Sequence, residues 1–140
     1  MPTYRTISEE ATIALGEELA RELPARAVVL LIGNLGAGKT TLAKGIVKGI
    51  GAAAHDEVSS PTFTLIHEYG GGKVYHIDLY RLEEPREVAT LGLDELFNRE
   101  AVVLIEWGER FPQLLPAERI EIRLRAAGND ERIIEVTHTS

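Results

Sequence analysis

The clearest chemical signature in the chain lies in one segment, Gly33-Asn34-Leu35-Gly36-Ala37-Gly38-Lys39-Thr40, which matches the phosphate-binding pattern G-x-x-x-x-G-K-[ST]. Glycines let a backbone wrap closely around a phosphate chain with its N–H groups pointing inward. In this pattern the lysine reaches the β- and γ-phosphates, and the following hydroxyl holds Mg²⁺. The predicted nucleotide-binding residues are Gly33, Asn34, Leu35, Gly36, Ala37, Gly38, Lys39, Thr40 and Thr41.

The surroundings of this segment argue against a coincidental glycine-rich turn. A chance match in a chain of this length is on the order of 1 in 200. The apolar run Ala27–Ile32 comes directly before it and is typical of a strand buried on both faces. Residues 39–50 repeat apolar side chains every four positions, and Gly51 follows as a helix C-cap. The Asn-Lys-x-Asp signature of guanine-specific proteins is missing from the sequence, which favours ATP.

Two carboxylates at predicted strand ends are candidates for the acidic partner of this site. Glu106 follows the apolar residues 102–105, and Asp78 follows residues 74–77. An acid at the tip of a parallel strand lies beside the nucleotide site of an open α/β sheet. Each could coordinate Mg²⁺, directly or through water, or could orient the attacking water. Alternatively, each simply ends a strand in solvent, and the residues alone leave these roles open.

Three further features have a functional and a structural interpretation. Thr62, in the polar loop 59–62, could sense the γ-phosphate or its Mg²⁺, as switch loops do, or could belong to an ordinary turn. The four histidines, His76 among them, show no metal-ligand spacing, so we predict that each lies at the surface or fills a strand position. Trp107 either packs in the core or anchors a partner protein.

The rest of the pattern predicts the elements that position these residues. Thr6 to Glu9 fits a helix capping box, with Ser8 as a competing N-cap, and Pro24 ends that helix. The other predicted elements are a hairpin of strands 63–69 and 73–78, helices 85–91 and 93–97, a buried strand 101–105, and a hairpin of strands 120–125 and 132–137. Buried strands alternating with helices indicate an α/β, three-layer P-loop NTPase fold with a mixed, mostly parallel central sheet.

Length and composition exclude several classes of protein. The chain has 140 residues, of which 44% are hydrophobic and 26% charged, as is typical of one globular domain, here residues 1–140. Its longest apolar run is far shorter than the ~20 residues of a membrane span, and the N-terminus has no signal-peptide pattern. With 0 Cys, the chain has no disulfide framework. We therefore expect a cytoplasmic protein without a membrane partner.

The charge balance bears on nucleic acids. The chain carries 15 basic and 22 acidic residues, a formal net charge of −7. Proteins that grip nucleic-acid phosphates normally present a basic surface. This composition disfavours independent, tight binding to a nucleic acid but is compatible with a role beside one.

Four blocks together, residues 33–41, 60–65, 76–82 and Glu106-Trp107, resemble the bacterial TsaE family. The likeness runs from about Glu9 to Trp107. It implies a P-loop ATPase that binds ATP and Mg²⁺, with Thr40 and Glu106 as metal ligands, Thr62 in a switch-like loop and Asp78 required for hydrolysis. It also implies partners, the TsaD and TsaB proteins, whose complex transfers a threonylcarbamoyl group to an adenosine of tRNA. The ATPase of that family supports turnover of this complex and meets tRNA only indirectly.

The residues themselves leave three hypotheses for the function. The first is an ATPase subunit that works with other proteins, because a phosphate-loop core uses most of the chain and no lid-like insertion is evident. The second is a small-molecule phosphotransferase with Asp78 as the base for an acceptor hydroxyl. The third is a nucleotide-dependent binding switch with negligible hydrolysis.

Overall fold

The structure, a computed structural model, describes residues 2–61 and 65–139. Its centre is a seven-stranded sheet in the order β1-β7-β6-β2-β5-β4-β3. The strands are β1 (Thr3–Thr6), β2 (Ala27–Ile32), β3 (Ile66–Tyr69), β4 (Val74–Asp78), β5 (Val102–Glu106), β6 (Arg119–Ala126) and β7 (Arg132–Thr139). The helices are α1 (Glu9–Glu22), α2 (Lys39–Ile50), α3 (Pro85–Ala89) and α4 (Leu93–Phe97), with short 3-10 turns at His55–Glu57, Gly108–Arg110 and Pro112–Leu114.

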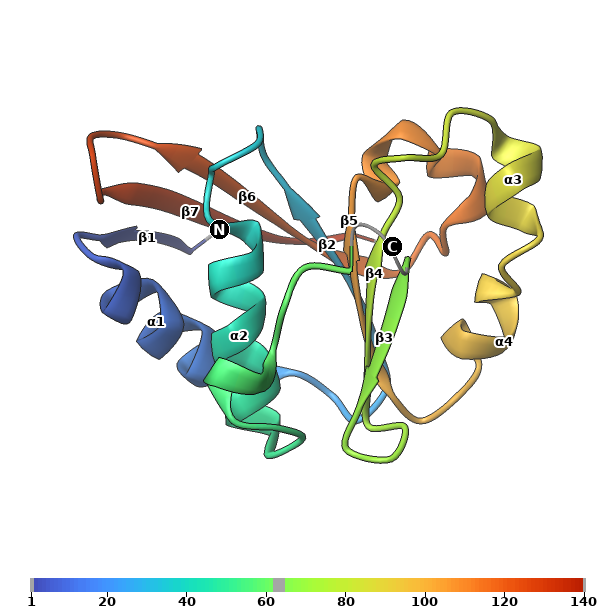
Figure 1. The fold of residues 1–140 in the computed structure, drawn as a ribbon, viewed down its shortest axis with the longest axis horizontal. Coiled ribbons are helices and arrows are strands. Elements are labelled where there is room, and N and C mark those ends of the chain that lie inside the picture. The colour runs from blue at the N-terminus through green and yellow to red at the C-terminus, as the bar shows by residue number, and fades with distance from the viewer. Residues whose placement is uncertain (1, 62–64, 140) are drawn as a thin grey trace.

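The sheet separates two apolar cores. Helices α1 and α2 cover one face, and α3 and α4 lie on the other, as Figure 1 shows. Alternate residues of β5 point to opposite faces: Leu104 packs with α1 and α2, whereas Val103 and Ile105 pack with α3 and α4. The three layers predicted from the sequence are therefore confirmed.

The sheet is mixed, with a parallel centre. Strand β2 pairs in parallel with both β5 and β6, and β4 pairs in parallel with β5. Strands β3 and β7 run antiparallel to their neighbours. The carboxyl ends of β2, β4 and β5 consequently meet at one edge of the sheet, where the loop from β2 to α2 begins (Figure 1).

The N-terminus differs from the sequence-based prediction. The capping box at Thr6 is wrong, because residues 3–6 form β1 and pair with β7. Ser8 is the N-cap of α1, and its hydroxyl accepts a hydrogen bond from the amide of Ala11 at 3.0 Å. The Thr6 hydroxyl instead bonds to the Thr12 hydroxyl at 2.7 Å. Strand β1 gains its stability from a partner more than 120 residues away, which local pattern analysis cannot detect.

Other boundaries shift by a few residues. Helix α3 ends at Ala89 rather than near residue 91, and β7 extends to Thr139. The described part of β3 begins at Ile66, after Leu65 turns the chain with a positive φ of 69°. Among the described residues, no helix is long and apolar enough to span a membrane.

Helix α1 supports α2 through an unusually close contact between glycines. A Cβ on Gly45 would lie 2.0 Å from the carbonyl oxygen of Ile13, and one on Gly16 would lie 2.6 Å from that of Leu42. Two backbones can approach this closely only when both positions lack side chains. The contact fixes α2, whose first residues are Lys39 and Thr40.

Replacing Gly45 by alanine should destabilise the fold by about 2–3 kcal/mol, because the added methyl group would overlap backbone atoms that cannot move independently. Urea unfolding followed by circular dichroism measures this loss. The matched control is Gly128→Ala, where the nearest atom would lie at an ordinary 3.7 Å. Equal midpoints for the two variants would contradict the close contact.

Candidate functional site

The phosphate loop connects β2 to α2 and has the backbone that anion binding requires. Gly36 and Gly38 adopt left-handed conformations, with φ of 81° and 99°. Gly38 is the N-cap of α2 and supplies no side-chain cap. The first turn of α2 therefore directs its amide groups and the positive end of the helix dipole toward the loop. A Cβ on Gly33 would lie 2.6 Å from the carbonyl oxygen of Leu124, so the loop packs against β6.

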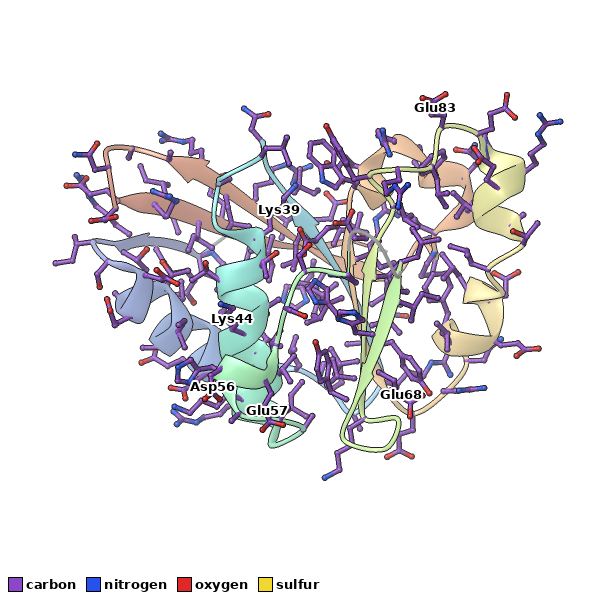
Figure 2. The ribbon with its side chains drawn as sticks, viewed as in Figure 1. Lys39, Lys44, Asp56, Glu57, Glu68 and Glu83 are labelled. Carbon is purple, nitrogen blue, oxygen red and sulfur yellow. The ribbon has the colours of Figure 1, made fainter. Side chains whose placement is uncertain are left out.

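Lys39 is buried at the start of α2, with 5% of its surface exposed. Figure 2 shows it at the N-terminal end of the helix, on the side that faces the central strands. Its Nζ donates a hydrogen bond to the carbonyl oxygen of Gly33 at 2.7 Å and lies 3.7 Å from the centre of the Trp107 ring. Burial lowers the pKa of Lys39, and the negative charges of Glu106, Glu109 and Asp78 oppose that shift.

The two carboxylates at the strand ends lie side by side. Asp78 and Glu106 are register partners at the carboxyl ends of β4 and β5, and each is only 4% exposed. The hydroxyl of Thr40 donates to Oε2 of Glu106 at 3.2 Å. The structure therefore brings the predicted metal ligands together across 66 residues of sequence. The alternative that these acids merely end strands in solvent is wrong, because both are buried.

Asp78 is held by the backbone that follows it. Its Oδ1 accepts a hydrogen bond from the amide of Tyr80 at 2.8 Å, and its own amide donates to the carbonyl of Leu65 at 2.9 Å. The second contact joins the end of β4 to Leu65, the residue directly before β3. Thr62 itself lies outside the described residues.

Trp107 follows Glu106 and does more than fill the core. It has a positive φ of 66°, a conformation that costs free energy for a residue with a side chain. This turn places the half-buried ring over the ammonium of Lys39 and 5.1 Å from the ring of Tyr80. The tryptophan thus lines the phosphate loop, a position that neither interpretation of the sequence included.

Arginines add further contacts that the sequence did not indicate. Arg132 of β7 donates from Nη2 to the carbonyl oxygen of Gly36 at 3.2 Å, which places a positive charge over the phosphate loop. Arg110 donates to the carbonyl oxygens of Leu79, at 2.5 Å, and of Tyr80, at 2.8 Å, and so holds the segment after Asp78. Both contacts join distant parts of the chain, so no local motif marks them.

A third acidic side chain, the half-buried Glu109, lies near Lys39. Glu109 sits in the turn after Trp107, and burial raises its pKa, while the positive charges of Lys39, Arg110 and Arg123 oppose the shift. Within the described part of the chain, its Oε1 is buried without a hydrogen-bond partner. The site thus combines one buried ammonium with three acidic side chains.

His76 was predicted to be a surface or strand-filling residue, and it does fill a strand position. It is fully buried in β4, and its Nε2 lies 2.6 Å from Oε2 of Glu106. Strand alternation could have indicated this position from the sequence, since His76 is two residues before Asp78 and so points to the same face.

Among the described residues, no group of three or more His, Cys, Asp or Glu side chains is arranged to hold a metal ion.

Comparisons with known proteins place this geometry in a family. The family model described as "Threonylcarbamoyl adenosine biosynthesis protein TsaE" matches residues 6–134. The tRNA threonylcarbamoyladenosine biosynthesis protein TsaE of Bacillus subtilis is 43% identical over 139 residues, which cover 98% of this chain and 84% of that protein. The protein of the same name from a Nostoc species is 43% identical over 135 residues, covering 92% and 81%.

The fold is also similar to that of a solved structure. The crystal structure of B. subtilis YdiB superposes with a TM-score of 0.80 at 37% sequence identity, and the match covers 99% of this chain and 86% of that one. Sequence and fold therefore give the same result. The chain belongs to the TsaE family and, with it, to tRNA threonylcarbamoyladenosine biosynthesis.

Proposed function

We propose that this chain binds ATP with Mg²⁺ and hydrolyses it slowly, as an accessory ATPase that supports turnover of the TsaD–TsaB transferase complex. One observation carries the proposal: the amino end of α2, the ammonium of Lys39 and the Thr40–Glu106 pair converge at the carboxyl end of β2. Loop amides and an ammonium suit a triphosphate. The net charge of −7 makes direct capture of tRNA by this chain unfavourable.

The donor groups fit magnesium. Mg²⁺ prefers oxygen ligands and usually keeps water and substrate phosphates in its shell, so one hydroxyl and one carboxylate suffice from the protein. Thr40 and Glu106 supply these two groups at 3.2 Å from each other. Magnesium, when bound, neutralises the charge that develops on the phosphate oxygens.

Asp78 is the residue that we assign to the attacking water. Glu106 contacts Thr40 and serves as the proposed metal ligand, and Asp78 lies beside it at the end of the neighbouring strand. The backbone amide of Tyr80 orients one of its carboxylate oxygens. A buried, oriented carboxylate can accept the proton of a water positioned in line with the γ-phosphate.

The surroundings of the site favour a partner-dependent reaction. Leu35, in the phosphate loop, is 69% exposed, and Tyr80, beside Trp107, is 42% exposed. Large apolar side chains at such exposure on two sides of a site suit contact with another protein. A partner that covers them would exclude water from the nucleotide and so raise the low basal rate.

Calorimetry and a phosphate-release assay on the purified chain, alone and with TsaD and TsaB, test this function. We expect binding of ATP that depends on Mg²⁺, slow release of phosphate by the chain alone, and faster release with the partners. Turnover at tens per second by the chain alone would contradict the partner-dependent proposal. Transfer of labelled phosphate to a metabolite would instead support a phosphotransferase, and negligible hydrolysis in every state would support a switch.

Glu106→Gln should reduce Mg²⁺-dependent hydrolysis by about 100-fold, because the amide is neutral and binds Mg²⁺ poorly. Binding of ATP in EDTA should change little. Initial rates measured across a Mg²⁺ titration check this result, with Glu121→Gln on β6 as the control, since Glu121 pairs with Arg119 and Arg123 instead of Thr40. If Glu106→Gln hydrolyses ATP at the wild-type rate at low Mg²⁺, Glu106 is not a metal ligand.

A further inference from the structure

His76 occupies a position where an apolar side chain would be expected. It lies in β4, its exposed fraction is 0%, and its face of the sheet packs against α2 with Val74, Val102 and Leu104 as neighbours on the strands. Burying a polar ring here lowers stability unless its nitrogens are hydrogen-bonded. The contacts of the His76 ring must therefore explain why a polar residue occupies this apolar core.

One nitrogen of the ring has a short contact, and the other has none. Nε2 lies 2.6 Å from Oε2 of Glu106, and because a carboxylate oxygen only accepts, Nε2 carries the hydrogen. Within the described part of the chain, Nδ1 is buried without a partner. An unsatisfied buried polar atom costs about 1–3 kcal/mol, so the packing of the core alone does not favour histidine at this position.

The contact restricts the carboxylate of Glu106. Its Oε2 accepts from two donors that belong to different elements, the ring of His76 in β4 and the hydroxyl of Thr40 in α2. A glutamate side chain bound at one oxygen by two groups from different elements cannot rotate freely about its last bond. Residues that hold a metal-binding carboxylate commonly change metal affinity by 10- to 100-fold when removed.

We propose that His76 is a positioning residue, which holds the Glu106 carboxylate in the orientation that accepts Mg²⁺ beside Thr40. This inference rests on the proposed Mg²⁺-ATP site. His76 touches neither nucleotide nor metal in this assignment, and it acts only through Glu106. Its removal should therefore weaken the coupling between Mg²⁺ and nucleotide rather than nucleotide binding itself.

The test measures binding without turnover. Calorimetry with the non-hydrolysable analogue β,γ-imido-ATP gives the Kd in Mg²⁺ and in EDTA, and the ratio of the two is the magnesium coupling. In His76→Phe, which keeps a planar aromatic ring but removes the donor, we expect this ratio to fall by about 10-fold or more, with the Kd in EDTA unchanged. His76→Gln places an amide N–H near the position of Nε2 and should recover part of the ratio.

The matched control is His67→Phe. His67 lies directly opposite His76 on β3, and its Nδ1 is 3.2 Å from the hydroxyl of Tyr69 rather than near Glu106. Its ratio should equal that of the wild-type chain. If His76→Phe does not fold, His76→Asn takes its place, because the shorter amide cannot reach Glu106. A lower magnesium coupling in His76→Asn than in His76→Gln then supports the proposal, and equal coupling in the two variants contradicts it.

Two negative results have different meanings. If the wild-type chain binds the analogue with Mg²⁺ and the His76 variants keep its ratio, the positioning role is overturned and the proposed function stands. If the wild-type ratio is 1, with no magnesium coupling at all, the proposed function fails and this inference fails with it.

Discussion

Replacing Lys39 by alanine is expected to weaken ATP binding by roughly 30- to 150-fold, equivalent to about 2–3 kcal/mol for the loss of a charged hydrogen-bond donor. The reason is the charge around the phosphate loop. Lys39 is the buried ammonium beside three acidic side chains, Glu106, Glu109 and Asp78, so its removal leaves a negative environment for a negative ligand. Calorimetric titration with ATP in Mg²⁺ measures the effect.

The control for this variant lies on the same helix. Lys44→Ala removes a positive charge from α2 farther from its amino end, as Figure 2 shows, and should leave the Kd for ATP close to that of the wild-type chain. A second variant, Lys39→Met, keeps an unbranched stem against Trp107 and separates loss of charge from loss of packing. Wild-type affinity in Lys39→Ala would show that the loop does not bind triphosphate in the proposed manner.

Replacing Asp78 by asparagine is expected to lower the rate of hydrolysis by about 10²- to 10⁴-fold while leaving the Kd for ATP unchanged, the range that follows from the loss of a general base. Asparagine keeps the shape of the side chain and an oxygen that can accept from the amide of Tyr80, so the loop after β4 should retain its conformation. Asp78→Ala should slow turnover equally but loosen that loop.

Single-turnover hydrolysis and calorimetry on the same preparation separate rate from binding. Glu83→Gln is the charge-matched control, since Glu83 is exposed in the segment before α3 and is labelled away from Lys39 in Figure 2. An Asp78→Asn protein that hydrolyses ATP at the wild-type rate would exclude the residue from the mechanism. Equal losses of rate and affinity would assign it to nucleotide binding.

The sequence was sufficient for the elements whose information is local. The phosphate loop follows from eight consecutive residues because its backbone needs glycine at φ of 81° and 99°, and the adjoining strand and helix follow from apolar periodicity. Gly51 was correctly identified as the C-cap of α2, with φ of 82°. The three-layer arrangement also follows from local patterns, since strands buried on both faces need helices on both sides.

Tertiary structure alone decided which of these elements meet, because sheet order and register depend on pairing between distant segments. The parallel β4–β5–β2 arrangement sets Glu106 beside Thr40 and directs His76 onto the same carboxylate. These strands are buried on both faces, so the sequence pattern does not distinguish that register from one shifted by a residue, although such a shift would place His76 and Glu106 on opposite faces of the sheet. Eight consecutive residues therefore identify the phosphate loop, because its conformation depends on local sequence. The carboxylates Asp78 and Glu106 become neighbours only through the pairing of β4 with β5, which depends on segments far apart in the chain.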